Sequence, residues 1–200
     1  MTPLLNPSDF VNRWGSGIQP VRFRPKPFLP SDSSRFYRDA GFPSCFRIKF
    51  YRELKFQSEC VPLSIVWQQI QGDEWKMPHA WNIFWKIGDA EFGQSTAWLC
   101  IEELTGRIVT VDPEVADNPV LHLSSSPIKL ATCMLLYKEW FVNVGSRPID
   151  KQCREQLTVL SEHHVFDDGD GRRFWFPSGF LNDDDTDMIG DGAVIEIETR

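Results

Sequence analysis

The sequence lacks paired cysteines and long apolar runs. Its five cysteines are an odd number, widely spaced, with no C-x-x-C pair. This spacing argues against both a disulfide framework and a cysteine-based zinc site. No apolar run approaches the length needed to cross a bilayer, and residues 1–10 lack the basic start and apolar stretch of a secretory signal. The sequence therefore predicts a cytoplasmic chain with reduced thiols and no membrane contact.

Motifs of the common catalytic chemistries are also missing. The chain contains no G-x-S-x-G elbow, no P-loop, no G-x-G-x-x-G turn after a strand and no H-E-x-x-H helix. Glu102 and Glu103 are adjacent carboxylates, but on a strand they point to opposite faces. Cys100 lies in an apolar run, which is typical of an inert core thiol. We therefore predict a binding protein, not an enzyme, that uses no cofactor.

A metal site is not predicted either. Asp183, Asp185 and Asp187 match the first three ligand positions of a calcium loop, since hard cations prefer closely spaced oxygen ligands. Met188 then stands where the loop requires glycine, and Val194 where it requires a bidentate glutamate. A looser cation site is the alternative to a solvated or partner-binding acidic loop, and we favour the acidic loop.

Charge is abundant but unevenly distributed. The net charge is −7; residues 1–60 hold ten Lys/Arg and five Asp/Glu, whereas residues 162–200 hold three and eleven. The basic front and the acidic end either attract each other within one molecule, or the acidic end meets a basic partner. Arg22, Arg24 and Lys26 alternate with apolar neighbours, and we favour a solvated edge strand over a nucleic-acid-binding strip.

Length and composition predict one globular domain with extensions. The 200 residues are 42% hydrophobic and 24% charged, which is ordinary for a globular protein. Six prolines in residues 1–30 predict an extended arm, because proline removes a backbone donor and fixes φ. Residues 31–200 are predicted to form a single α+β domain with an acidic extension after about residue 164.

Three apolar runs within residues 82–112 organise the predicted sheet. Gly88-Asp89 ends the first run, and Thr105-Gly106 separates the second from the third. Glycine can take the positive φ that tight hairpins require, so these runs predict an antiparallel meander of three strands. The residues predicted to share the core face of the third strand are Arg107, Val109 and Val111.

Several further elements are predicted from local patterns. Ser31 or Asp32 is expected to cap a helix that buries Phe36 and Tyr37, and Ser124 to Ser126 followed by Pro127 are expected to begin a long, central helix. The predicted helices span residues 32–40, 124–142 and 150–163. Residues 62–70 fit the spacing of a helix but also have strand propensity, and we favour the helix. The further predicted strands span residues 45–57, 172–176 and 193–197.

Several short motifs are similar to those of a known family. An apolar strand ending in Ile87-Gly88-Asp89, the Thr105-Gly106-Arg107-Ile108 turn, and the serines that open a helix through Leu135-Leu136-Tyr137 resemble the SUKH superfamily over roughly residues 30–142. The resemblance implies an α+β fold with a mixed, mainly antiparallel sheet covered by helices. That superfamily contains bacterial toxin-immunity proteins and relatives of a yeast cell-wall-synthesis regulator.

The resemblance implies an immunity function, in which the chain binds and neutralises a cognate polymorphic toxin. Such a toxin is often a nuclease or deaminase, and a basic toxin domain would suit the acidic end of this chain. A regulatory protein-interaction scaffold of the same fold is the alternative, and an enzyme with a non-obvious site is a less favoured one. A nucleic-acid partner is not expected.

Aromatic residues beside acidic ones predict the partner surface, because interface energy concentrates in aromatic anchors surrounded by polar groups. Residues 73–81 and 89–92 are read as loops with this mixture, and an acidic loop adds attraction for a basic partner. The predicted partner-binding residues are Trp75, Trp81, Asp89, Glu91, Phe92, Asp183, Asp184 and Asp185. Trp75, Glu91 and Phe92 are expected to be exposed on one face; the alternative is that Trp75 and Phe92 cap the core.

Overall fold

The structure is a computed structural model that describes residues 5–48, 52–72, 76–92, 95–115 and 119–144. The helix predicted over 150–163, the strands predicted over 172–176 and 193–197, and the acidic loop around Asp183 lie outside the described residues. Within the described part of the chain, no helix is long and apolar enough to span a membrane.

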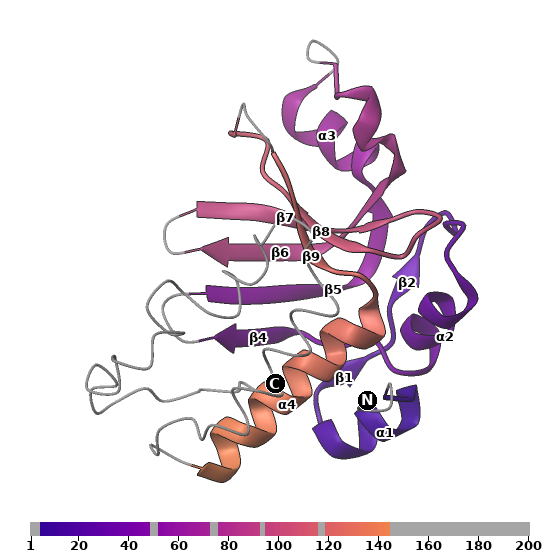
Figure 1. Cartoon of the computed structure of the whole chain (residues 1–200). Helices are drawn as coiled ribbons and strands as arrows, with labels where there is room; N and C mark the ends of the chain where they lie inside the picture. Colours follow the sequence, from indigo (N-terminus) through magenta and orange to yellow (C-terminus); the bar gives the residue numbers. More distant parts are fainter. Residues whose placement is uncertain (1–4, 49–51, 73–75, 93–94, 116–118, 145–200) are drawn as a thin grey trace.

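A mixed, mostly antiparallel sheet lies at the centre of the described residues (Figure 1). Its strands are β2 (Arg22–Phe23), β4 (Cys45–Ile48), β5 (Arg52–Pro62), β6 (Phe84–Phe92), β7 (Ser95–Glu102), β8 (Ile108–Val111) and β9 (Val120–Ser124). Neighbouring strands run in the order β2-β5-β6-β7-β8-β9, β4 also pairs with β5, and only the β2–β5 pair among these is parallel. A separate short ribbon pairs β1 (Ile18–Gln19) with β3 (Phe42–Pro43). The predicted meander is confirmed as β6–β7–β8.

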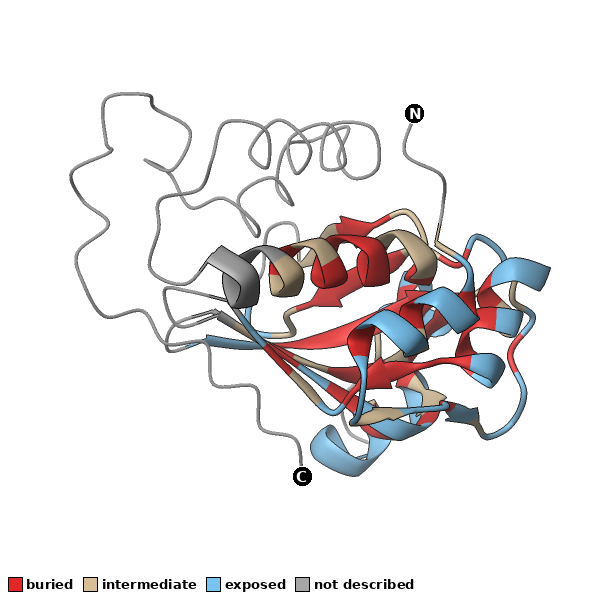
Figure 2. Cartoon of the chain, turned by 90° about the horizontal axis from the view of Figure 1, so that it is seen from below, coloured by how far each residue is buried: buried red, intermediate tan, exposed pale blue. Residues whose placement is uncertain are grey.

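Helices pack on both faces of this sheet, which makes the fold α+β as predicted. The helices are α1 (Pro7–Trp14), α2 (Ser31–Asp39), α3 (Leu63–Gln71), α4 (Pro127–Val144) and the 3₁₀ helix η1 (His79–Ile83). α1, α2 and α4 enclose the larger core with one face of the sheet. α3 and η1 enclose a smaller core on the other face. Figure 2 shows the buried residues concentrated between α4 and the strands.

Burial on both faces corrects the predicted orientation of β8. Val109 and Val111 face the smaller core with α3 and η1, as expected of a core face. Ile108 faces the larger core beneath α4 and is fully buried, so the prediction of a single core face is wrong. Because helices cover both sides here, the residues of β8 are buried on both faces, as the apolar run of β7 also is.

The N-terminal segment departs from the predicted extended arm. Residues 7–14 form α1, with Pro7 at a first-turn position and the side chain of Asn6 accepting a hydrogen bond of 2.8 Å from the Asp9 amide. Proline suits the start of a helix because a backbone N–H in the first turn, which proline lacks, would have no partner within the helix. Phe10 and Trp14 are buried in the larger core. The edge strand is confirmed, since β2 lies at the edge of the sheet with Arg22 exposed.

The segment read as one strand over 45–57 is two paired strands, β4 and β5, with Cys45 opposite Lys55. Both strands carry alternating residues, so the pattern gave no sign of the reversal between them. β5 continues to Pro62, where α3 begins, and this helix is confirmed. α2 is confirmed with Phe36 and Tyr37 buried, although its start has no side-chain cap.

α4 begins as its sequence predicts. The Ser126 hydroxyl accepts a hydrogen bond of 3.2 Å from the Lys129 amide, and Pro127 opens the helix. Leu130 and Met134 are fully buried in the larger core. The cap and the apolar residues together place α4 across the sheet, so the helix is central, as predicted.

Candidate functional site

The predicted partner residues fall into three groups. Trp75 and the acidic residues 183–185 lie outside the described residues, as does the side chain of Phe92. Trp81 is only 6% exposed, and its ring lies 5.5 Å from that of Trp67 in the smaller core. In this structure the Trp81 ring packs the core instead of reaching solvent. Asp89 and Glu91 are both partly exposed.

Asp89 and Glu91 are in a strand, not in the predicted loop. β6 continues to Phe92 across Gly88, which lies at a register shift between β6 and β7. A Cβ atom at Gly88 would collide with the carbonyl oxygen of Lys55. Gly88 therefore permits the close approach of β5 and does not end the strand. Asp89 and Glu91 alternate with buried Ala90, so both project from the same face of the sheet.

This face carries charged side chains from three adjacent strands, and we refer to it as the charged sheet face. Its members are Arg47 of β4, Glu53 and Lys55 of β5, and Lys86, Asp89 and Glu91 of β6. α3 and η1 cover the part of the same side near β7 and β8, where Trp98, Val109 and Val111 are buried. The charged sheet face is thus the part of this side that those two helices leave open.

Ion pairs connect these side chains across the strands. The Lys55 ammonium lies 2.5 Å from a Glu91 oxygen and 3.8 Å from a Glu53 oxygen. The Arg47 guanidinium lies 3.3 Å from Glu53. Within β6, Lys86 lies 2.8 Å from Asp89. The face therefore holds three cationic and three anionic side chains, whose charges alternate and sum to zero.

Glu53 is the central member of this network, and its side chain is only 14% exposed. Burial tends to raise the pKa of its carboxyl, but the hydrogen bond from Cys45 and the charges of Lys55 and Arg47 outweigh burial and lower it. The Cys45 thiol donates to Glu53 over 2.5 Å. Burial, together with this carboxylate, raises the pKa of Cys45 to about 12. Cys45 is therefore held as a thiol, which is a poor nucleophile.

A second carboxylate network closes the β7–β8 hairpin. Glu102 is buried, accepts hydrogen bonds of 2.6 and 3.2 Å from the Arg107 guanidinium, and accepts one of 2.5 Å from the Thr105 hydroxyl. Glu103 points elsewhere and accepts from the Phe28 amide over 2.7 Å. The two adjacent carboxylates therefore do not form an acid/base pair, which agrees with the prediction from the sequence. Glu102 holds the side chains of Arg107 and Thr105, and Glu103 holds the backbone of Phe28.

A surface cleft of about 410 Å³ lies beside β5. It is lined by Gln19, Phe42, Ser44, Phe56, Gln57, Ser58 and Glu59. Phe42 and Phe56 stack with ring centroids 4.2 Å apart. The carboxylate of the cleft, Glu59, lies 2.9 Å from Arg24. The lining includes no nucleophile paired with a base, and the described residues hold no group of three or more side chains suited to a metal ion.

Among the comparisons with known proteins, a family model matches this chain. Neither the curated proteins nor the solved structures give a match. The model of the family described as SUKH-4 immunity protein matches residues 15–156, which span the whole described sheet and α2, α3 and α4. α1, although packed in the larger core, precedes the matched residues. The chain belongs to the SUKH-4 immunity protein family, within the SUKH superfamily.

Proposed function

We propose that this protein is an immunity protein that binds and neutralises a cognate toxin in the cytoplasm, without catalysis. The observation that carries the proposal is the SUKH-4 family match across residues 15–156. An immunity protein needs a rigid, specific surface and no reactive centre. The charged sheet face supports such a role, because its side chains stand on paired strands and its thiol, Cys45, is held protonated.

We further propose that the toxin contacts the charged sheet face. Lys55 and Glu91 are 47% and 33% exposed, so both can exchange their mutual ion pair for contacts across an interface. Alternating charges of this kind favour register and partner choice more than raw affinity. Trp75, Phe92 and the acidic residues 183–185 remain proposed members of the partner surface. A basic nuclease or deaminase domain is the proposed class of toxin.

The experiment uses the full chain and an inactivated toxin domain encoded beside its gene. Isothermal titration calorimetry should show a stoichiometric complex, and co-expression should protect cells from the active toxin. The absence of both binding and protection would overturn the proposal. Capture of a host regulator without protection would instead support the scaffold function.

A charge reversal tests the proposed surface. Glu91→Lys places two ammonium groups opposite each other and should weaken the complex and slow association, with the effect declining as salt rises. Glu114→Lys is the control, since Glu114 is exposed in the turn after β8, outside the three strands that carry this face. Equal affinity of both variants would exclude the charged sheet face as the contact.

A further inference from the structure

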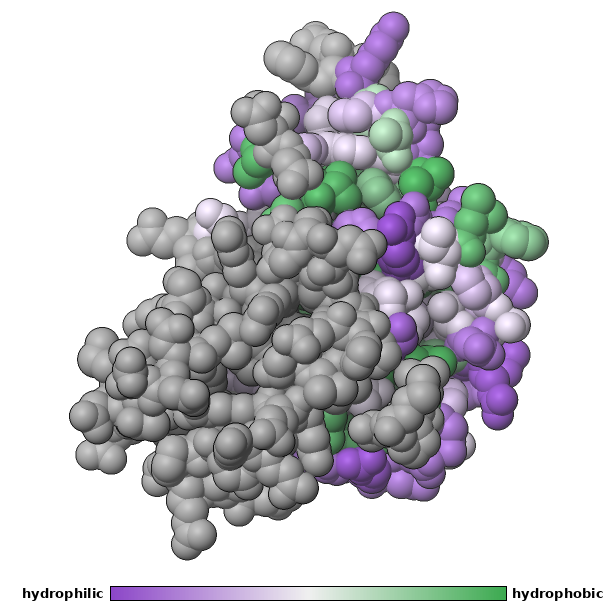
Figure 3. All heavy atoms as spheres, in the orientation of Figure 1, coloured by the Kyte–Doolittle hydropathy of each residue, from purple (hydrophilic) through white to green (hydrophobic). Residues whose placement is uncertain are grey.

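Two large apolar side chains stand in solvent at the end of the β7–β8 hairpin. Phe28 is 74% exposed and Leu104 is 65% exposed, the highest values for large hydrophobic residues in the described part of the chain. Ile83 is 39% exposed and lies in the chain segment that is hydrogen-bonded to the hairpin at Glu103. Figure 3 shows hydrophobic side chains at the right-hand edge of the molecule, where Figure 1 places this hairpin beside β2. We call this surface the Phe28–Leu104 patch.

Backbone hydrogen bonds fix the patch in place. The Leu104 amide donates to the Phe28 carbonyl over 2.9 Å, and the Phe28 amide donates to the Glu103 carboxylate over 2.7 Å. The Glu103 amide donates to the Ile83 carbonyl over 2.7 Å. Three chain segments are therefore joined at their backbones while their apolar side chains point outward. Such preorganisation lowers the entropy lost on binding.

Leu104 has an unfavourable backbone conformation for its side chain. Its φ is 74°, and it is the one residue other than glycine with positive φ among those described. The Thr105 amide donates to the Glu103 carbonyl over 3.0 Å, so Leu104 is the central residue of a γ-turn of the rare, strained type. Glycine would take this conformation without strain. Folding therefore explains neither the leucine nor its exposure, and such outliers point to function.

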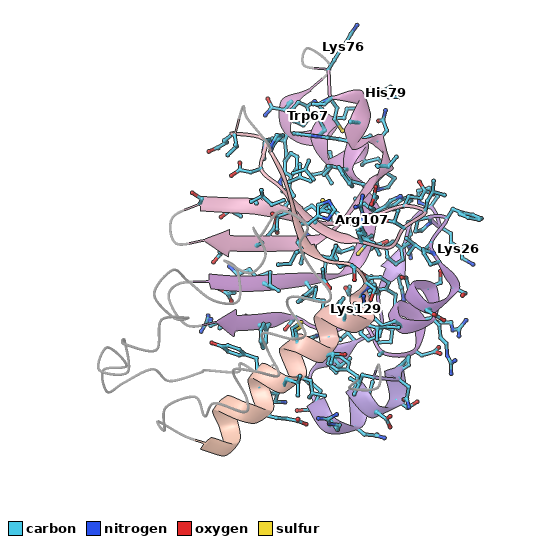
Figure 4. All side chains as sticks on the ribbon, in the orientation of Figure 1. Lys26, Trp67, Lys76, His79, Arg107 and Lys129 are labelled. Atoms are coloured by element: carbon cyan, nitrogen blue, oxygen red, sulfur yellow. The ribbon has the colours of Figure 1, made fainter. Side chains whose placement is uncertain are left out.

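The segment that leads to Phe28 carries positive charge without ion-pair partners among the described residues. Glu103 is engaged by the Phe28 amide, and Glu59 lies 2.9 Å from Arg24. Lys26 is exposed and has no ion-pair partner among the described residues, and Figure 4 shows it at the same edge of the molecule. Arg22 is likewise exposed without such a partner in that part of the chain. A complementary surface would carry carboxylates around an apolar centre.

We propose that the Phe28–Leu104 patch is an anchor for the toxin, inserting into an apolar pocket of the toxin that is bordered by carboxylates. The inference rests on the proposed immunity function and adds a second contact, separate from the charged sheet face. Exposed apolar residues held rigid beside charged side chains have the character of interface hot spots.

Leu104→Gly and Phe28→Ser test the anchor against the same inactivated toxin domain. Each should raise the dissociation constant by about tenfold or more, mainly through faster dissociation. Leu104→Gly removes strain, so its melting temperature should equal or exceed that of the parent. A gain in stability together with a loss of binding would show that Leu104 serves docking and not folding. Ile70→Ser, at a 57% exposed position on α3, is the control and should bind within about twofold of the parent.

Lys26→Glu tests the carboxylates proposed around the toxin's pocket. This variant should associate more slowly, and its association should depend less on salt. Tighter binding by this variant would overturn the proposed carboxylates. Parent-like binding by both Leu104→Gly and Phe28→Ser would overturn the anchor while leaving the immunity function intact. A toxin that fails to bind the parent chain, with no protection of cells, would overturn both proposals.

Discussion

Gly106 allows the β7–β8 hairpin to rest on α2. Its φ is 73°, and a Cβ atom there would lie 2.5 Å from the Ser33 hydroxyl oxygen. Gly106→Ala should lower the free energy of unfolding by about 1–3 kcal/mol, because it adds both backbone strain and a steric contact. Part of this loss should disappear in a Ser33→Gly background, which removes the side chain that the added Cβ atom would meet. Thermal unfolding measures the loss in both backgrounds; equal losses would mean that the contact with Ser33 is unimportant.

Glu102 makes the stability of the same hairpin dependent on pH. Burial tends to raise the pKa of its carboxyl, but hydrogen bonds from Arg107 and Thr105 lower it below its usual value. The stabilisation is therefore present above the unfolded pKa of about 4.3 and is lost as pH falls through the lower folded pKa. Glu102→Gln should reduce the free energy of unfolding at pH 7 by about 1–3 kcal/mol.

Urea unfolding at several pH values measures this effect. The parent and Glu102→Gln should converge in stability as pH falls below about 4, since both are then uncharged at this position. Asp39→Asn is the control, because its pairs with Arg38 and Arg35 are exposed and contribute little. A constant difference between parent and Glu102→Gln down to pH 2 would contradict the assignment.

Among the elements, α4 depends on its N-terminal cap. Ser126→Ala removes the acceptor for the Lys129 amide and should cost about 1 kcal/mol of stability, whereas Ser126→Asp should retain it. Ser125 offers a neighbouring control, because its buried hydroxyl has no hydrogen-bond partner among the described residues. Ser125→Ala should be neutral or stabilising. Denaturant midpoints that rank these two alanine variants in the opposite order would refute the cap.

Elements were predicted best where local chemistry fixes them. Three serines before Pro127 specify a helix start, and Gly106 specifies a hairpin, because each depends on backbone groups a few residues away. Gly88 was misread as the end of a strand, since its role is to admit the distant Lys55 carbonyl. The sequence does not predict β9, and its prolines predict extended chain where α1 forms.

At the scale of the whole molecule, the four described thiols are unpaired, and three of them are buried. Cys45, Cys60, Cys100 and Cys133 are free, and burial raises the pKa of Cys60 and Cys133 to about 12. Thiol titration in denaturant without reductant should give five reactive groups, including Cys153, which lies outside the described residues. In native buffer at pH 8 the described thiols should react slowly. Fewer than five groups in denaturant would indicate a disulfide.

The sequence by itself determined the α+β class, the meander, the buried Phe36 and Tyr37 of α2, and the family. The structural features follow from residue order, which sets periodicity, caps and turns within short segments, and the family follows from short motifs that resemble it. Tertiary structure decided that Trp81 is buried while Phe28 and Leu104 are exposed, and that Asp89 and Glu91 share ion pairs with Lys86 and Lys55. Exposure and pairing depend on which distant segment arrives at a given face, so periodicity within one segment cannot specify them.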